Sequence, residues 1–264
     1  NASLLAVIIK LQKAREEKGA SVTRAFPPLF WGVGVLLVVL VYGTVRLPMV
    51  ERAFEEQPEI KVGIIQPNVD QDVKWDNAHF WPIMRKQMRL TEKLEKEGPR
   101  LIIWPEAAIP IGNFNLHWEQ KGHLTRFLSE VDTYFLMGGI SLEKCEEGPR
   151  GLCSFNSAYL FAPNAEELLA RYDKIRLVPF SEYVPLEKLF FFAEAISQGH
   201  VGSTTPGEEI KVMPVPGMKV GCVICYELVF PHLVRKFPDH GADVMTTITN
   251  DAWFGRTGAP YQHH

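Results

Sequence analysis

The chain has 264 residues, of which 46% are hydrophobic and 22% charged, and its formal net charge is -3. This length and composition allow a sizeable core in one large or two modest domains, which excludes a disordered protein. The sequence has no long basic run that could neutralise phosphates, so nucleic acid is not an expected partner.

The first expected element is a membrane-spanning helix over residues 25–46. No side chain from Ala25 to Val45 is charged, and a helix of this length at ~1.5 Å per residue spans ~30 Å, the thickness of a hydrocarbon core. A buried core helix is one alternative, but such helices rarely run so long without a polar face. A cleaved signal peptide is another, although no small-x-small cleavage site follows Val45.

The residues before this helix predict on which side of the membrane the rest of the chain lies. Residues 1–24 begin with the apolar Ala2–Ile9, typical of the end of an earlier membrane helix, and continue with more Lys and Arg than Glu. Excess positive charge marks cytoplasmic loops, so everything after Arg46 is expected on the extracytoplasmic side. Disulfides persist there, so Cys145 and Cys153 either close a short loop or are two unrelated free thiols.

A linker over 47–60 is expected to lead into an α/β domain over 61–264. The expected strands are 61–66, 101–104, 134–137, 156–161, 218–226 and 244–248, of which the first two read as buried. The expected helices are 80–94, 117–131 and 228–237, and Gly138-Gly139 predicts a turn. Strands that alternate with helices predict central strands covered on both faces, with catalytic groups at strand ends.

Cys225 is a candidate nucleophile because it stands where an apolar strand ends and a helix begins. Such a turn holds a thiol rigidly, beside main-chain N–H groups that can face a developing oxyanion. The alternative is a buried structural cysteine. Cys222 and Cys225 also form a C-x-x-C pair, but side chains three apart on a strand point to opposite faces. No second ligand pair accompanies them, so neither a metal site nor thiol–disulfide exchange is expected.

Two further segments carry candidate catalytic charges. Glu106 directly follows an expected buried strand and lies between two prolines among apolar neighbours, where desolvation would make it a better general base. A solvated loop glutamate is the alternative. Lys174 lies with Arg171 and Arg176 in an otherwise apolar and aromatic stretch, and a lysine taken alone is more often a surface residue. No one of these motifs decides the function.

Together, the three segments resemble the Glu-Lys-Cys signature of the nitrilase superfamily. They read W-P-E ending at Glu106, Y-D-K-x-x-L-V-P-F from Tyr172 and I-C-Y-E from Ile224, in that order and each beside a strand end. Further segments are similar to the bacterial apolipoprotein N-acyltransferase family, a nitrilase-like domain set among membrane helices. They are Q-P-N at 66–68, K-W-D at 74–76, S-E-Y-V-P at 181–185 and N-D-A-W-F-G at 250–255.

The resemblance implies a nitrilase-like α-β-β-α sandwich and a fatty acyl transfer. The acyl chain would pass from a membrane phospholipid to the N-terminal cysteine amine of a diacylglyceryl-modified lipoprotein, at the bacterial inner membrane with the catalytic domain in the periplasm. By position, Cys225 would be the nucleophile, Glu106 the base and Lys174 the oxyanion partner, with no metal or organic cofactor. The supporting residues would be Glu182, Tyr226, Glu227, Asn156, Trp75 and Trp253.

The chain also departs from that family, which has several membrane helices before a longer catalytic domain. The sequence from Asn1 to His264 is therefore expected to be a fragment with a C-terminally incomplete domain. Two rivals stay open: a nitrilase-type amidase that hydrolyses a small C–N bond, and a non-catalytic membrane receptor that keeps the fold. The apolar segment 186–196 is expected either as a core helix or as a gate that dips into the outer leaflet.

Overall fold

The computed structural model describes residues 5–6, 8–9, 12, 27–109, 118–146, 151–165, 167–185, 204–255 and 257–258. The chain divides into two compact units, Asn1–Glu59 and Ile60–His264. The expected gate or core helix at 186–196 lies outside the described residues.

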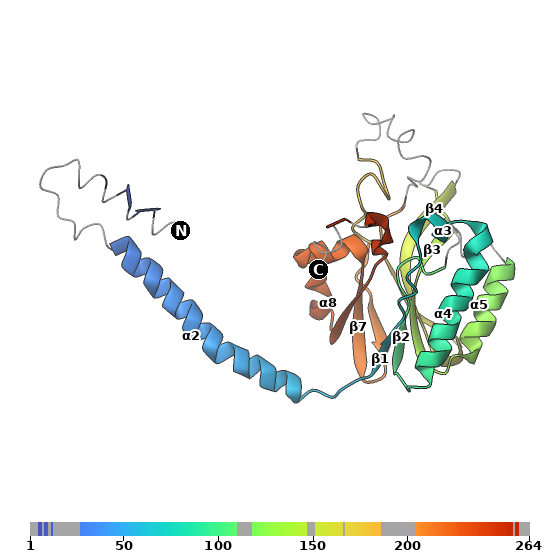
Figure 1. The fold of residues 1–264 in the computed structure, drawn as a ribbon, viewed down its shortest axis with the longest axis horizontal. Helices are drawn as coiled ribbons and strands as arrows, with labels where there is room; N and C mark the ends of the chain where they lie inside the picture. Colours follow the sequence, from blue (N-terminus) through green and yellow to red (C-terminus); the bar gives the residue numbers. More distant parts are fainter. Residues whose placement is uncertain are drawn as a thin grey trace, which may run out of the picture. The chain divides into compact units, whose positions relative to one another are not determined.

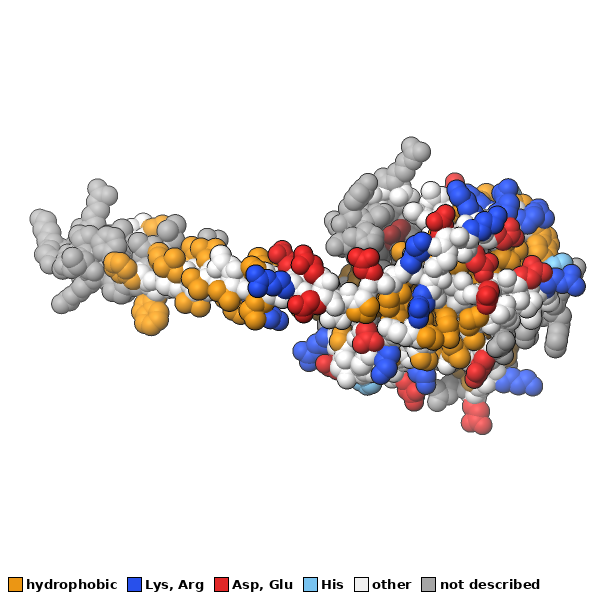
Figure 2. Space-filling model, turned by 90° about the horizontal axis from the view of Figure 1, so that it is seen from below, with side chains coloured by type: hydrophobic (Ala, Val, Ile, Leu, Met, Phe, Trp, Pro, Cys, Tyr) orange, Lys and Arg blue, Asp and Glu red, His pale blue; other side chains and the backbone are white. Residues whose placement is uncertain are grey.

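The first unit contains the long helix α2, Pro27–Glu55 (Figure 1). Its stretch Phe30–Glu55 contains an 18-residue window with a mean hydropathy of 2.1 and is long and apolar enough to cross a membrane. Apolar side chains cover the helix and charged ones gather toward its C-terminal end (Figure 2), and Trp31 is 77% exposed. Apolar residues exposed on all faces favour a helix in lipid over a buried core helix. The helix continues past residue 46, because Glu51, Arg52 and other good helix formers follow Pro48.

The second unit is built on two sheets in the described part of the chain. A five-stranded sheet has the order β1-β2-β3-β4-β5, in which β1, β2 and β3 run parallel and the other neighbours antiparallel. A three-stranded sheet pairs β6 with β7 antiparallel and β7 with β8 parallel. The strands are β1 Val62–Ile64, β2 Leu101–Ile103, β3 Tyr134–Lys144, β4 Leu152–Phe161, β5 Leu168–Asp173, β6 Val212–Val215, β7 Met218–Ile224 and β8 Val244–Ile248.

The helices complete a layered α-β-β-α arrangement, as expected. In Figure 1, α4 and α5 cover the outer face of the five-stranded sheet, and α8 lies on the far side of the three-stranded sheet. One apolar core packs α4 and α5 against β2 and β3, and another fills the space between the sheets. The helical elements of this unit are α3 Gln71–Lys74, η2 Asn77–His79, α4 Phe80–Glu95, α5 Trp118–Glu130, η4 Pro163–Ala165, η5 Cys225–Val229, α7 Pro231–Val234, α8 Lys236–Asp239 and η6 Asp251–Phe254.

The predicted turn at Gly138-Gly139 is wrong, because both residues lie inside the long strand β3. Gly138 is needed there for another reason. A Cβ atom on Gly138 would lie 2.6 Å from the Pro105 carbonyl oxygen and 2.7 Å from the Glu106 Cα. The glycine therefore lets β3 approach the main chain that carries Glu106.

Other differences from the expected elements have local causes. β1 is not a buried strand: Ile64 is 72% exposed, because β1 is at the edge of its sheet in the described part of the chain. The helix expected at 228–237 is instead η5, α7 and α8, because Pro231 starts a new helix and holds Phe230 outside the helical region. The strand expected at 218–226 ends at Ile224, one residue before Cys225.

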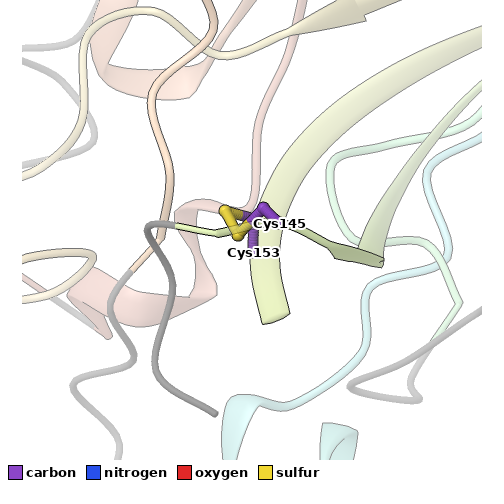
Figure 3. The surroundings of a disulfide bond; sticks show 2 residues. All are labelled: Cys145 and Cys153. Carbon is purple, nitrogen blue, oxygen red and sulfur yellow. A yellow bond between two sulfur atoms is a disulfide. The ribbon is translucent and has the colours of Figure 1, made fainter. Parts of the chain in front are cut away.

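Cys145 and Cys153 form a disulfide, with their Cα atoms 5.6 Å apart (Figure 3). The bond joins the residue after β3 to the start of β4, beside a main-chain hydrogen bond from the Cys145 N–H to the Gly151 carbonyl. Of the two alternatives that the sequence leaves open, the structure therefore has the closed loop.

Candidate active site

Glu106, Lys174 and Cys225 each follow the last residues of a strand and meet at one place. Glu106 comes after β2, Lys174 after β5 and Cys225 after β7. The Lys174 Nζ lies 3.5 Å from the Glu106 Oε1. The Cys225 thiol lies near enough to Glu106 and Lys174 for both to shift its pKa. The fold thus brings together three residues that are far apart in the sequence.

Glu106 is a buried carboxylate, 6% exposed, surrounded by hydrogen-bond donors. Its Oε1 accepts from the Asn156 Nδ2 at 2.8 Å, and its Oε2 accepts from the Asn250 main-chain N–H at 2.9 Å. Both partners donate, and the Lys174 ammonium lies next to Oε1. The arrangement fits an ionised carboxylate, which is the form that can act as a base.

Cys225 has a strained backbone and a thiol that stays protonated at neutral pH. Its φ is +52°, in the left-handed region that side chains other than glycine rarely adopt. Burial raises the pKa of Cys225 to about 11 and the Glu106 carboxylate adds to this rise, while Lys174 and a hydrogen bond with Thr249 oppose it. A thiol in this state needs a base before it can attack, and Glu106 is the carboxylate whose proximity raises its pKa.

Lys174 is buried between two carboxylates, with only 1% of the residue exposed. Its Nζ lies 2.9 Å from the Glu182 Oε2 as well as near Glu106. Burial works to lower the pKa of Lys174, but the charges of Glu106 and Glu182 outweigh it and the pKa is raised. Lys174 is therefore a permanent cation, suited to stabilise negative charge rather than to take a proton.

Glu182 and Asn156 complete a buried polar network around Lys174. The Asn156 Nδ2 donates to Glu182 at 2.9 Å in addition to Glu106. The Glu182 Oε2 also accepts from the Val178 main-chain N–H at 2.8 Å. The Asn156 Oδ1 is buried and has no hydrogen-bond partner among the described residues. Asn156 thus bridges both carboxylates of the site.

Glu227 is fully buried and holds two parts of the site together without facing the thiol. Its oxygens accept hydrogen bonds at 2.8 to 3.1 Å from both sides of the site, namely from the Tyr172 hydroxyl and the main-chain N–H groups of Ile175, Arg176 and Ile224. Burial raises the pKa of Glu227, although these hydrogen bonds oppose the rise. The contacts tie the end of β7, next to Cys225, to the segment that follows Lys174.

Comparison with known proteins places this site in a family. The sequence model of the carbon–nitrogen hydrolases matches residues 61–264. The chain belongs to the carbon–nitrogen hydrolase family. Curated relatives include the apolipoprotein N-acyltransferases of Geobacter metallireducens, 37% identical over 230 residues, and of Rickettsia typhi, 33% identical over 229 residues. These matches confirm the resemblance that the sequence motifs indicate.

The chain spans less than half the length of these relatives. Each match covers 87% of this chain but 42% of the Geobacter protein and 44% of the Rickettsia protein. Among solved structures, the NitN amidase of Neterenkonia sp. AN1 is similar with a TM-score of 0.52 and 19% identity, covering 76% of this chain and 71% of that one. Nit3 of Saccharomyces cerevisiae has a TM-score of 0.50 and 18% identity, covering 72% and 64%. At these identities the likeness shows the carbon–nitrogen hydrolase fold alone.

Three other expected site residues have different placements in this carbon–nitrogen hydrolase domain. Tyr226 lies in the first turn of η5, where N–H groups have no partner inside the helix, and its ring packs edge-on against Phe230 at 5.1 Å. Trp75 follows α3, and its buried Nε1 has no hydrogen-bond partner among the described residues. The main chain of Trp253 lies in η6, but its side chain is outside the described part.

Two residues that contact Glu106 are not predicted as site residues by the sequence. Asn250 donates its main-chain N–H to the carboxylate, and the buried Lys74 donates its Nζ to the Glu106 main-chain carbonyl at 3.2 Å. Both stand in segments that resemble the acyltransferase family, K-W-D and N-D-A-W-F-G, and that is the signal that could have found them. They also line a cavity of about 880 Å³ between the ends of β1 and β2 and the end of β8.

In the part of the chain that the structure describes, no cluster of metal-ligating side chains accompanies this site. Within the described ranges, no three His, Cys, Asp or Glu residues lie close enough together to hold a metal ion. The free cysteines there are Cys222, which is buried in the core between the sheets, and Cys225. The two cysteines of the C-x-x-C pair therefore have different surroundings.

Proposed function

We propose that the chain is the membrane-anchored catalytic part of an apolipoprotein N-acyltransferase. It would transfer a fatty acyl chain from a membrane phospholipid to the N-terminal cysteine amine of a diacylglyceryl-modified lipoprotein. The observation that carries this proposal is the meeting of Glu106, Lys174 and Cys225 at the ends of three strands. The names of the relatives support the choice of substrate.

In the first half-reaction, the Cys225 sulfur attacks the ester carbonyl of the phospholipid while Glu106 takes the thiol proton. The oxyanion that forms is stabilised by the Lys174 ammonium and by the Tyr226 main-chain N–H. Loss of one such donor typically costs about 3 kcal/mol of transition-state stabilisation. When the carbonyl re-forms, the ester C–O bond breaks, Glu106 returns the proton to the leaving oxygen, and a lysophospholipid departs from a Cys225 thioester.

In the second half-reaction, the amine of the lipoprotein cysteine attacks the thioester carbonyl. Glu106 takes a proton from the attacking nitrogen, and the same donors stabilise the second oxyanion. The C–S bond then breaks and the proton passes to the Cys225 sulfur, which restores the thiol. The network of Asn156 and Glu182 would keep Glu106 and Lys174 in place through both steps.

Anchoring in the membrane suits a phospholipid donor, which then never has to leave the bilayer. The apolar helix Phe30–Glu55 would supply the anchor. We propose the extracytoplasmic side for the catalytic domain, on the basis of the basic residues before α2 and of the disulfide between Cys145 and Cys153. In a bacterium with an outer membrane this compartment is the periplasm.

The intact mass of the protein after incubation with phospholipid vesicles tests the proposal. An adduct with the mass of one fatty acyl group should appear and should be removed by hydroxylamine, which cleaves thioesters. The adduct should be absent in Cys225→Ser and retained in Cys222→Ala, which changes the buried neighbour. Full turnover by Cys225→Ser would refute the mechanism. Hydrolysis of small soluble amides without any lipid adduct would favour the amidase alternative.

A further inference from the structure

Lys74 is a buried cation that the proposed mechanism does not use. It is the last residue of α3 and only 5% exposed. Lysine is almost never this buried unless its ammonium group is paired, because removing that group from water is costly. Burial lowers the pKa of Lys74 to about 8, although the Glu106 carboxylate draws it back up. An apolar side chain of similar length would cost less here, so a role other than stability is indicated.

One contact of Lys74 is with the peptide group that follows Glu106. Its Nζ donates to the Glu106 main-chain carbonyl at 3.2 Å. That carbonyl belongs to the peptide joining Glu106 to Ala107, whose φ is +45°, in the left-handed region. Relaxation of the main chain at Ala107 would relieve this strain and would shift the Glu106 main chain from which the carboxylate side chain extends. The hydrogen bond from Lys74 opposes that shift.

The other end of α3 reaches the Glu106 carboxylate. The Gln71 Oε1 accepts from the Asn250 Nδ2 at 3.0 Å, and the Asn250 main-chain N–H donates to the Glu106 Oε2 at 2.9 Å. Gln71 and Lys74 are three residues apart on one helical turn, so their side chains lie on the same face. This single turn therefore contacts Glu106 directly at the main chain and through Asn250 at the carboxylate.

We propose that α3 is a positioning element for Glu106, with Lys74 as its principal positioning residue. Lys74 keeps the strained Glu106–Ala107 peptide in the orientation that aims the carboxylate at the Cys225 thiol, and Gln71 supports the carboxylate through Asn250. The inference rests on the proposed function, because it assigns α3 to the step in which Glu106 takes the thiol proton.

A double-mutant cycle tests this assignment in the full chain. The readout is the burst of p-nitrophenolate released when p-nitrophenyl butyrate acylates Cys225, which needs no phospholipid. Lys74→Met should slow the burst by on the order of 10- to 100-fold, as expected for a misplaced base. In the Glu106→Gln background, Lys74→Met should change the burst rate by less than about twofold, because the group it positions is gone. Gln71→Ala should show the same pattern with a smaller loss.

Lys61 provides the matched control, since its exposed side chain also donates to a main-chain carbonyl, that of Glu97. Lys61→Met should leave the burst unchanged. Thermal unfolding should show that Lys74→Met is folded. The inference is overturned if Lys74→Met and Gln71→Ala leave the burst rate unaltered. It is also overturned if these substitutions slow the burst by the same factor in the protein that has Glu106 and in the Glu106→Gln variant. A chain that gives no burst at all contradicts the proposed function itself, and the inference falls with it.

Discussion

Glu106 and Glu227 are both buried carboxylates, but their hydrogen-bond partners suit them to different roles. Glu227 accepts from main-chain N–H groups and the Tyr172 hydroxyl, contacts that no step of the proposed reaction would break. Glu106 accepts from Asn156 and Asn250 and also lies near enough to the Cys225 thiol to raise its pKa. A proton can therefore move between Cys225 and Glu106, whereas Glu227 holds the surrounding chain segments.

Replacing Glu106 by Gln should slow acylation of Cys225 by about two to four orders of magnitude, because the amide cannot accept the thiol proton. One end of the new amide would also meet groups that donate, Asn156 or Asn250, at a cost of about 1 to 3 kcal/mol in the free energy of unfolding. The burst of p-nitrophenolate measures the first effect and urea unfolding the second. A folded Glu106→Gln protein that reacts at the normal rate would show that Glu106 is not the base.

The lowered pKa of Lys74 predicts a pH-dependent stability. Because its folded-state pKa is about 8 instead of 10.5, the unfolded chain binds more protons between these two pH values. Below pH 8 the full cost of burying the ammonium is present, about 3 kcal/mol, and it diminishes as the pH rises to 10.5.

Lys74→Met should therefore have a larger free energy of unfolding than the unaltered protein. The difference between the two proteins should be larger at pH 7 than at pH 9.5. Urea unfolding at the two pH values measures this change, and Lys61→Met, at an exposed lysine, should show none. The same difference at both pH values would mean that Lys74 is not desolvated as the structure indicates.

At the level of secondary structure, the sequence predicts elements whose burial follows a local pattern. α4, β2 and β8 match the expected ranges closely, because their apolar residues recur at helical spacing or form short continuous runs. β5 is not predicted because it contains Arg171, whose guanidinium lies against the rings of Phe155 and Tyr159 on the neighbouring strand. Such contacts between strands leave no mark in the local sequence.

The candidate site likewise contains some residues that the sequence predicts and others that only the tertiary structure reveals. Glu106, Lys174 and Cys225 can be predicted as a set because their three segments together resemble the Glu-Lys-Cys signature, and the structure brings them together. Lys74 stands in a polar stretch whose local pattern looks solvated, so only the K-W-D resemblance points to it, and only the tertiary fold shows that it is buried against Glu106. The sequence patterns indicate which residues lie at strand ends, but they do not indicate which loops pack over those ends.

Gly138 lets β3 approach the main chain that carries Glu106, and its replacement tests whether this close packing positions Glu106. In Gly138→Ala the new Cβ would meet main-chain atoms of Pro105 and Glu106 that cannot move aside independently. We expect a loss of about 1 to 3 kcal/mol in unfolding free energy and a slower p-nitrophenolate burst, because Glu106 is displaced. Gly139→Ala is the matched control, since its Cβ would lie 3.5 Å from the nearest atom, in the Tyr159 ring. Equal effects at the two glycines would contradict this account.

For the molecule as a whole, the two units differ in the solvent that each one needs. The second unit buries its apolar side chains in two cores and needs no lipid to do so. α2 instead exposes its apolar side chains, including Leu36 and Leu40, each more than half exposed. Water would penalise that surface and a bilayer would not. The proposed anchoring by α2 can therefore be tested separately from the proposed chemistry at Cys225.

Introducing Lys at Leu36 and Leu40 should release the protein from the membrane, because two lysines at the centre of a spanning helix cost about 6 kcal/mol of insertion free energy. As a matched control, Lys at Leu47 and Met49, nearer the charged end of α2, can extend to the interface and should leave the protein membrane-bound. Carbonate extraction of membranes measures retention. The central variant should keep the p-nitrophenolate burst but lose acylation by phospholipid vesicles, since its site is intact and its donor is no longer within reach. Undiminished acylation by vesicles after release would show that α2 does not serve to bring the phospholipid to Cys225.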